Sequence, residues 1–339
     1  MERTAGYGER FERSLREEGR SHGFDGTDEE FGDWQSDTRE RLESVLGIPR
    51  IRQRAVAPRA RRLATRDAGD HVRETWTVRT EPDLAVPFYV LLPSSADPPY
   101  PVVVALHGHA DAGKDLTVGA VEDQTPVDEQ RRDIGRQAVR RGYAVIAPDL
   151  RGFGDLTGPE PDADGYRRCT TMQKHAQLLG RTLLGERVWD VTRLLSVVTD
   201  RPELDGDRIG IAGHSGGGAV ALFAAALEDR LSPVAVSGFF CAFEDSIVAT
   251  DHCECNYVPG LLALGEVWDV AGLVAPRPLL VSAGEADHLF PVDGVERAFA
   301  ELERIYRAAG RPDRCRLAIG PGGHRVHPDH VWSFVDEHR

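Results

Sequence analysis

The segment Arg208-Ile-Gly-Ile-Ala-Gly-His-Ser-Gly-Gly217 decides the fold of this chain. Its second half fits the pattern G-x-S-x-G, in which a serine occupies a sharp turn from a strand into a helix. Strand and helix nearly touch at such a turn, so the flanking residues must be small. Residues 208–213 indicate a buried strand and residues 219–227 a buried helix, which is the expected context. A plain glycine turn with an incidental serine is the alternative.

Similar apolar runs surround this segment and alternate with helical patterns. Continuous apolar runs are typical of strands that are covered on both faces of a parallel sheet. Apolar residues spaced by three and four, as in residues 184–198 and 295–306, indicate helices with one buried face. This alternation predicts an α/β fold with a mostly parallel sheet. The expected strands are residues 71–79, 86–92, 101–107, 143–149, 208–214, 233–238, 278–283 and 316–319.

Residues 1–69 differ from the rest of the chain, because they are rich in arginine and other charged residues. Their scattered apolar positions predict a helical extension that packs on the main domain rather than a disordered tail. We therefore expect an N-terminal helical extension over residues 1–69 and a catalytic domain over residues 70–339. The residues expected to make the packing contacts are Phe31, Trp34, Leu42 and Leu46.

Composition excludes several classes of function. The chain has 339 residues and a formal net charge of -14, which argues against binding to nucleic acid or to anionic membranes. No apolar run is long enough to span a bilayer, and the N-terminus lacks the apolar segment of a secretory signal. Five cysteines do not indicate a disulfide framework. We expect a cytoplasmic protein that acts on a small molecule; a homo-oligomer is left open.

A serine hydroxyl is a weak nucleophile until a base accepts its proton, and a carboxylate usually orients that base. In folds with this turn the chain order is serine, acid, histidine. Downstream of Ser215, Asp287 follows the apolar run 279–281, at the strand end where α/β sites gather. We predict Asp287 as the acid. Glu285 is the nearest rival, and a turn or helix-capping role for Asp287 is the alternative.

The predicted base is His324, which follows the last expected strand and the glycine-rich segment 320–323. Glycines allow this loop to bring an imidazole back over the end of the sheet. His327 and His330 are rivals only three and six residues further on. We expect them on the closing helix, with a surface role.

An ester or amide under attack develops an oxyanion, which needs preorganised N–H donors. The backbone N–H of Gly216, directly after the serine, is one predicted donor. The second is the backbone N–H of His109, in the loop that follows the run 102–104. The His109 imidazole is also a candidate for the pocket wall. An ordinary glycine turn is the alternative for this loop.

Four further residues are candidates for the substrate pocket: His214, Arg151, Phe153 and Trp268. The loop that contains Arg151 and Phe153 follows a buried strand and should border the site, although both residues could equally pack the loop. Trp268 is a candidate for the acyl or leaving-group pocket, with buried packing as the alternative.

The stretch Asp251-His-Cys-Glu-Cys255 suggests a metal site, because zinc prefers cysteine and histidine ligands. However, a lone C-x-C pair lacks the second ligand pair, and nothing nearby in sequence supplies one at the usual spacing. We therefore expect no metal or other cofactor and interpret this stretch as a lid or pocket wall.

Together, His107-Gly-His109, Asp149-Leu-Arg-Gly152, Gly213-His-Ser-Gly-Gly217, Asp287 and Gly323-His324 resemble the α/β-hydrolase superfamily. The chain is most similar to the branch of dienelactone hydrolases, acetyl xylan esterases and cephalosporin C deacetylases, from about residue 70 to the end. The resemblance implies an eight-stranded sheet with helices on both faces, and ester hydrolysis through an acyl-serine without a cofactor. Dienelactone hydrolases use cysteine at the position of Ser215, which argues against a dienelactone substrate.

The sequence therefore predicts a serine carboxylesterase that acts on small or sugar-linked acyl esters. Two alternatives keep the fold: a serine peptidase or amidase, and a non-catalytic binding protein on a hydrolase scaffold. Fold alone does not establish activity, but an intact serine, acid and histidine favour the enzyme.

Overall fold

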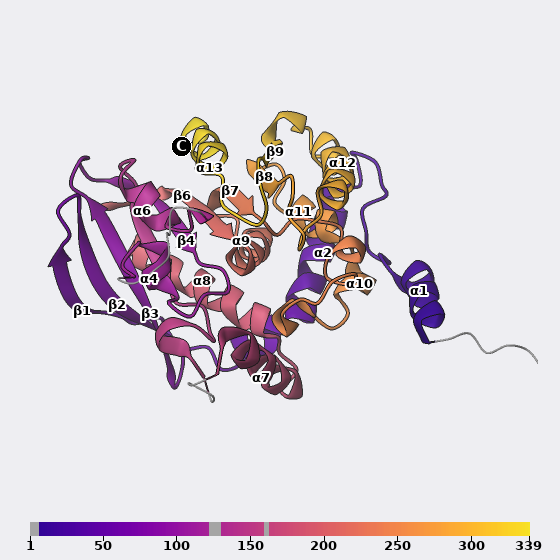
Figure 1. Ribbon diagram of the computed structural model, residues 1–339, viewed down its shortest axis with the longest axis horizontal. Helices are drawn as coiled ribbons and strands as arrows, with labels where there is room; N and C mark the ends of the chain where they lie inside the picture. Colours follow the sequence, from indigo (N-terminus) through magenta and orange to yellow (C-terminus); the bar gives the residue numbers. More distant parts are fainter. Residues whose placement is uncertain (1–6, 122–129, 159–162) are drawn as a thin grey trace, which may run out of the picture.

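The computed structural model describes residues 7–121, 130–158 and 163–339. A single mixed sheet forms its centre, and helices lie on both sides of that sheet (Figure 1). The described strands follow the spatial order β1-β2-β3-β5-β4-β6-β7-β8-β9. They are β1 (Ala60–Asp67), β2 (His71–Glu81), β3 (Leu84–Pro93), β4 (Tyr100–Leu106), β5 (Ala144–Pro148), β6 (Leu204–His214), β7 (Leu231–Ser237), β8 (Leu279–Gly284) and β9 (Cys315–Gly320).

The sheet changes direction between β3 and β5. The pairs β1–β2, β2–β3 and β3–β5 are antiparallel, whereas all pairs from β5 through β4 to β9 are parallel. This arrangement confirms the predicted α/β-hydrolase fold with its mostly parallel sheet. All carboxyl ends of the parallel strands therefore lie at one edge, which is where sites form in such folds.

One expectation was wrong: the described sheet has nine strands, not eight. The additional strand is β1, which lies within the predicted N-terminal extension. Every residue of β1 is exposed, and the strand pairs only with β2 at the edge of the sheet. A solvated edge strand needs no apolar alternation, so its sequence Ala-Arg-Arg-Leu-Ala-Thr-Arg-Asp gave no strand signal. Its charges also discourage pairing with another sheet edge.

The described helices begin in the N-terminal region and recur between the strands. They are α1 (Tyr7–Glu18), α2 (Phe31–Leu46), α3 (Ile48–Arg52), α4 (Lys114–Thr117), α6 (Ile134–Val139), α7 (Gly165–Leu178), α8 (Leu183–Thr199), α9 (Gly216–Leu227), α10 (Leu261–Leu264), α11 (Val267–Gly272), α12 (Val292–Ala308) and α13 (Pro328–Glu337). Among the residues described, no helix has both the length and the apolar character needed to cross a bilayer.

The predicted packing of the N-terminal helices is confirmed. Leu42 and Leu46 of α2 are fully buried in the main core, and Phe31 and Trp34 pack against it. The Gln35 side chain also donates a hydrogen bond of 2.7 Å to the carbonyl oxygen of Ala275. Apolar burial and polar contacts thus hold α2 on the body of the molecule.

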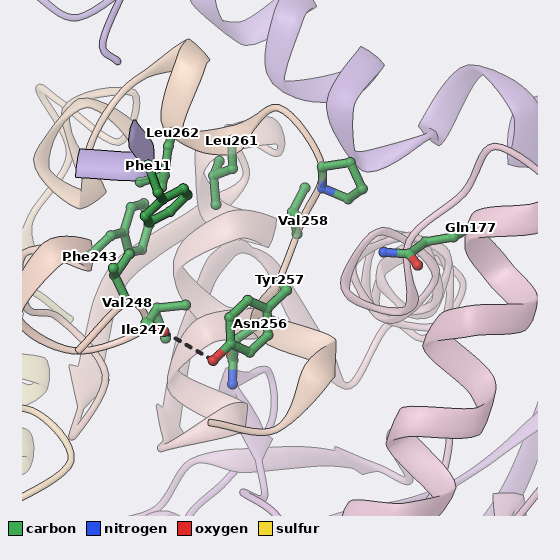
Figure 2. Close-up of a pocket in the computed structure, with 11 residues that line it drawn as sticks. Phe11, Gln177, Phe243, Ile247, Val248, Asn256, Tyr257, Val258, Leu261 and Leu262 are labelled. Atoms are coloured by element: carbon green, nitrogen blue, oxygen red, sulfur yellow. Dashed lines mark hydrogen bonds between the residues drawn. The ribbon is translucent and has the colours of Figure 1, made fainter. Parts of the chain in front are cut away.

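The segment between β7 and α11 packs beside α1 and carries few regular elements. An apolar groove of about 440 Å³ lies here, lined by side chains of α1, α7 and residues 243–262. Figure 2 shows Phe11 of α1 opposite Phe243 and Leu262, and the hydroxyl of Tyr257 donating to the carbonyl oxygen of Ile247 at 3.0 Å.

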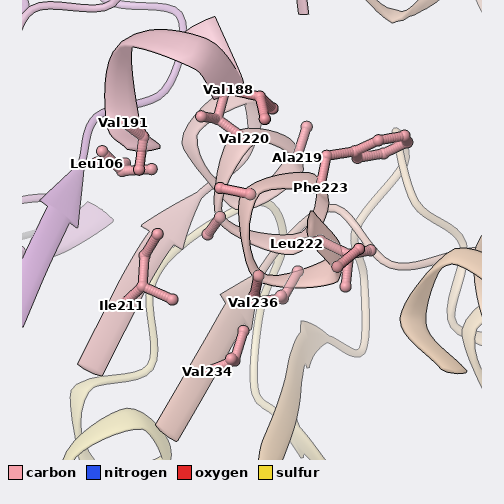
Figure 3. Close-up of a cluster of buried hydrophobic side chains, with 14 of the residues drawn as sticks. Leu106, Val188, Val191, Ile211, Ala219, Val220, Leu222, Phe223, Val234 and Val236 are labelled. Carbon is pink, nitrogen blue, oxygen red and sulfur yellow. The ribbon is translucent and has the colours of Figure 1, made fainter. Parts of the chain in front are cut away.

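The core follows from the alternation of side chains along each strand. Val102 and Val104 of β4 belong to one buried cluster, whereas Val103 and Ala105 belong to another. Successive strand residues point to opposite faces, so the sheet separates two apolar layers. The larger layer contains α9, whose Val220 and Phe223 lie over β6 and β7 in Figure 3. This packing fixes the start of α9, which is also the position of Ser215.

Candidate active site

Ser215 lies between β6 and α9 in a backbone conformation that L-residues rarely adopt, with φ 56° and ψ -123°. Such a conformation costs on the order of 1–3 kcal/mol and persists only where the surroundings enforce it. Here the Ser215 N–H donates to the carbonyl oxygen of Ser237 at 2.8 Å. A side chain at Gly217 would place Cβ 2.5 Å from the carbonyl oxygens of Leu106 and His107. The requirement for small neighbours is thus visible in the packing.

Asp287 and His324 meet beside this turn. His324 Nδ1 lies 2.7 Å from Asp287 Oδ2, while Oδ1 accepts hydrogen bonds from the backbone N–H groups of Leu289 and Phe290 at 2.9 and 3.2 Å. Although burial opposes ionisation, the hydrogen bonds from His324 and from these amides lower the pKa of Asp287. A carboxylate held ionised in this way orients the imidazole and stabilises its protonated form.

The rival acid and bases do not take part in this contact. Glu285 is exposed, and its backbone N–H binds the carbonyl oxygen of Gly320. His327 is buried directly before α13, against Gly320, and its ring stacks near that of His330 at a centroid distance of 5.2 Å. His327 was expected at the surface, but the closing loop turns its ring inward. Of the three histidines, only His324 contacts Asp287.

The loop after β4 packs directly against the turn that contains Ser215. A side chain at Gly108 would place Cβ 2.9 Å from the carbonyl oxygen of His214 and 3.1 Å from Cβ of Ser215. His107 anchors the loop, because its Nε2 accepts from the backbone N–H of Leu150 at 2.9 Å. Burial lowers the pKa of His107 to about 3, so the ring stays neutral and can accept.

His109 borders Gly216 from the same loop. A Cβ at Gly216 would lie 2.6 Å from His109 Nδ1, so only glycine leaves room for this ring. Gly216 is the first residue of α9, and the first N–H groups of a helix have no intrahelical partner. An anion is also stabilised at a helix N-terminus by the helix dipole. The structure therefore brings the two predicted donor residues together next to Ser215.

A cavity of about 90 Å³ connects these groups. Ser215 and His324 both line it, although the described contacts include no hydrogen bond between them. The His214 ring also lines this cavity and lies 4.7 Å, centroid to centroid, from the ring of His324. Among the described residues, the lining consists of Gly108, His109, Ala110, Leu116, Gln130, Arg132, Tyr166, His214, Ser215, Leu289 and His324.

Arg132 and Tyr166 are lining residues that the sequence did not predict. The ring of Tyr166 stacks on that of His109 at a centroid distance of 5.1 Å. The Nε atom of Arg132 is buried without a hydrogen-bond partner in the described structure. Burial also lowers the pKa of this guanidinium from its ordinary value. Both residues stand in polar stretches without a motif, so no local pattern could have revealed them.

The other pocket candidates lie elsewhere. Arg151 does not line the cavity: it is buried, with its guanidinium 2.9, 3.0 and 2.7 Å from carboxylate oxygens of Glu81, Glu186 and Asp190. Its strand end was predicted correctly, but the long side chain turns away from the cavity toward these acids on β2 and α8. The alternative of loop packing is therefore the better description.

Phe153 and Trp268 also pack rather than line the cavity. Phe153 is buried and meets the edges of the rings of His107 and His109, at 5.6 and 5.3 Å. It thus supports the loop from behind. Trp268, on α11, lies under the guanidinium of Arg20 at 4.9 Å and borders a separate cleft. Likewise, none of the residues that line the apolar groove of Figure 2 belongs to the serine, acid and histidine group.

Comparison with known proteins agrees with this geometry. The sequence profile of a family described as the Abhydrolase family matches residues 19–319. The chain belongs to the Abhydrolase family. This Abhydrolase-family chain is 29% identical over 301 residues to a Bacillus subtilis (strain 168) protein named "Putative hydrolase YtaP", covering 86% of this chain and 94% of that protein.

Solved structures of low sequence identity share the fold. One is described as a putative acetyl xylan esterase of Bacteroides fragilis NCTC 9343, with a TM-score of 0.78 and 18% identity, over 94% of this chain and 83% of that one. A glucuronoyl esterase of Teredinibacter turnerae T7901 has a TM-score of 0.65 and 17% identity, over 92% and 86%. Acetyl xylan esterase 1 of a Thermoanaerobacterium species gives 0.58 and 19%, over 96% and 98%.

Proposed function

We propose that this Abhydrolase-family chain is a serine carboxylesterase that removes small acyl groups, such as acetyl, from small or sugar-linked alcohols. The observation that carries the proposal is the convergence of Ser215, at its strained turn, with the hydrogen-bonded pair Asp287–His324 at one small cavity. The solved structures that share the fold include esterases, which agrees with this reaction class.

In the first half-reaction, Ser215 Oγ attacks the ester carbonyl carbon and His324 Nε2 accepts the serine proton. The carbonyl oxygen becomes an oxyanion next to the N–H groups of Gly216 and His109. Collapse of this intermediate breaks the bond to the alcohol oxygen, which takes the proton from His324 and leaves. Asp287 holds the imidazole through Nδ1 and stabilises its protonated form.

In the second half-reaction, water repeats these steps on the acyl-serine. His324 takes a proton from the water as its oxygen attacks the acyl carbon, and returns that proton to Ser215 Oγ when the carboxylic acid is released. Both half-reactions thus use the same proton acceptor and the same oxyanion donors.

The size of the cavity supports a short acyl group. Pockets for drug-sized ligands enclose roughly 300–1,000 Å³, whereas the described residues around Ser215 enclose about 90 Å³. A space of this size favours an acetyl group over an octanoyl chain. The proposed location in the cytoplasm rests on the sequence alone.

Hydrolysis of p-nitrophenyl esters from acetate to octanoate tests the proposal. We expect the specificity constant kcat/KM to be highest for acetate and to fall with chain length, and a fluorophosphonate probe to label Ser215. Ser333→Ala, which changes an exposed hydroxyl on α13, is the matched control for Ser215→Ala. Activity that persists in Ser215→Ala, or hydrolysis of aminoacyl anilides in place of esters, would overturn the proposal.

A further inference from the structure

Four side chains with metal-binding atoms converge behind the wall of the active-site cavity. They are His109 of the loop after β4, Cys169 of α7, and Cys253 and Cys255 around a short 3₁₀ turn (Glu254–Asn256). One ligand atom from each residue lies within 4.8 Å of all the others. His109 Nε2 is 3.2 Å from Cys255 Sγ, and the sulfurs of Cys253 and Cys255 are 3.5 Å apart.

The distances of 3.2 and 3.5 Å are close to the spacing of ligand atoms in a tetrahedral coordination sphere. Zinc binds thiolate sulfur at about 2.3 Å and imidazole nitrogen at about 2.0–2.1 Å, which places neighbouring ligand atoms roughly 3.5–3.8 Å apart. The four atoms come from three segments that lie far apart in the chain. The second ligand pair that the C-x-C stretch lacks in sequence is thus supplied by the fold, as Cys169 and His109.

A buried cation beside the cluster gives a second, independent observation. The Arg187 side chain is 2% exposed, and its Nη2 donates to Cys169 Sγ at 3.0 Å. Its other described hydrogen bonds go to the carbonyl oxygen of Arg151, and no described carboxylate lies within ion-pair distance of it. A buried charge is costly without a counter-charge. Three thiolates, one divalent cation and this guanidinium together carry no net charge.

The rings around His109 hold its Nε2 toward the cysteines. Tyr166 stacks on one face of this ring, and Phe153 meets it edge-on at 5.3 Å. Cys169, Cys253 and Cys255 are all buried. The three cysteines are therefore shielded from bulk water, and the half-buried His109 is already oriented toward them.

We propose that His109, Cys169, Cys253 and Cys255 form a closed structural zinc site that anchors the loop of the active site. With four protein ligands the ion has no open position, as is typical of structural rather than catalytic zinc. Coordination through Nε2 leaves the proton on Nδ1 of His109, the atom that faces Gly216. The ion would thus join three structures: the loop that borders Ser215, helix α7, and the segment that continues into the apolar groove.

Metal analysis of the full-length protein tests this site independently of its activity. After expression with added zinc and exhaustive dialysis, we expect about one zinc per chain, as four protein ligands bind zinc tightly. Cys255→Ser should lower this content to a small fraction. The matched controls are Cys241→Ser and Cys315→Ser, because these two cysteines lie outside the cluster. The controls should keep the full content.

Wild-type protein provides a test that does not depend on the folding of any variant. Replacement of zinc by Co²⁺ should give a thiolate-to-cobalt charge-transfer band and the intense visible bands of a tetrahedral site. A mercurial reagent should release the zinc as it modifies the thiols. If the same residues instead bind one equivalent of another soft metal ion, this result would support the site and change only the identity of the bound ion.

Two results would overturn the zinc site. One is wild-type protein that takes up no metal and shows no thiolate band with Co²⁺. The other is Cys315→Ser losing as much metal as Cys255→Ser. The effect on catalysis rests on the proposed esterase function: if that function holds, metal-free enzyme should lose about 10–100-fold in kcat, with a smaller change in KM. Metal binding without any esterase activity would leave the site intact and refute only the proposed function.

Discussion

The cavity at Ser215 has two walls that are built in opposite ways. One wall is backbone: residues 213–217 form the turn, and close contacts with neighbouring main chain leave no room for a side chain at Gly213 or Gly217. The other wall consists of long side chains from separate segments, namely His109, Arg132 and Tyr166. The comparison indicates that the serine turn is encoded in a contiguous motif, whereas the side-chain wall depends on tertiary assembly. Substitutions can test each part of this contrast.

Removal of the reacting groups should give the largest effect. We expect Ser215→Ala and His324→Ala each to lower kcat by about 10⁴–10⁶-fold, because each abolishes the same proton-coupled attack. The double variant should lose no more than the larger single loss, since the two residues act as one unit. Steady-state kinetics on p-nitrophenyl acetate provides the measurement. Additive losses would show that Ser215 and His324 act independently and would contradict a single catalytic unit.

Substitution of Arg151 should give the next largest effect, and this effect should be on the free energy of unfolding rather than on kcat. In Arg151→Met, the carboxylates of Glu81, Glu186 and Asp190 lose the buried cation with which all three pair. Breaking a buried ion pair in this way costs about 3–5 kcal/mol. We expect a large fall in the free energy of unfolding, measured by urea denaturation, with nearly unchanged kcat per folded molecule.

Arg208→Met is the matched control for this variant. Arg208 pairs with Asp205 at 2.6 Å, but 43% of its side chain is exposed. A surface pair of this kind contributes about 0–1 kcal/mol. A drop in kcat for Arg151→Met without a change in stability would instead support a role of Arg151 in the substrate pocket. That role is one of the two alternatives that the sequence left open.

Gly217→Ala tests the backbone wall itself. The added Cβ would lie 2.5 Å from two carbonyl oxygens, neither of which is on a flexible side chain. Such overpacking costs about 1–3 kcal/mol and sometimes more. Gly206→Ala, where no atom lies within 4 Å of the new Cβ, should change the midpoint of denaturation very little. Equal stability of the two variants would contradict the close contact between the start of α9 and the end of β4.

The same contrast explains which features the sequence could predict. The β4 residues 102–105 are buried on both faces, so an apolar run revealed the strand. The exposed edge strand β1 has no such constraint and was missed. Asp287 and His324 were found because each follows a strand that ends at the same edge of the sheet. Chain order and strand ends are local signals, and they carry the proposed reacting groups.

Side-chain direction after a strand was not predictable in this way. Arg151 and Phe153 end the expected strand, yet one turns to an acidic cluster and the other supports His109 from behind. The sequence around Cys169 does not indicate a metal ligand. Cys169 becomes a candidate ligand only because α7 places it beside Cys253 and Cys255. Such convergence depends on distant contacts, so periodicity and spacing cannot reveal it.

Arg132 should give the smallest effect, and one that depends on the substrate. Its guanidinium lines the cavity, and its Nε is buried without a partner among the described residues. Burial lowers the pKa of this group from its ordinary value, but an arginine guanidinium stays protonated at neutral pH. A half-buried cation of this kind favours a substrate that brings a carboxylate, because a charge-assisted hydrogen bond contributes about 1.5–3 kcal/mol.

We therefore expect Arg132→Gln to raise KM about 10-fold for an ester with a free carboxylate, such as mono-p-nitrophenyl succinate, which corresponds to about 1.4 kcal/mol. The same variant should change kcat/KM for p-nitrophenyl acetate only slightly, since the neutral ester offers the guanidinium no counter-charge. An equal loss on both esters would instead assign Arg132 to the shape of the cavity. In that case the side-chain wall, like the backbone wall, would serve the reaction rather than the choice of substrate.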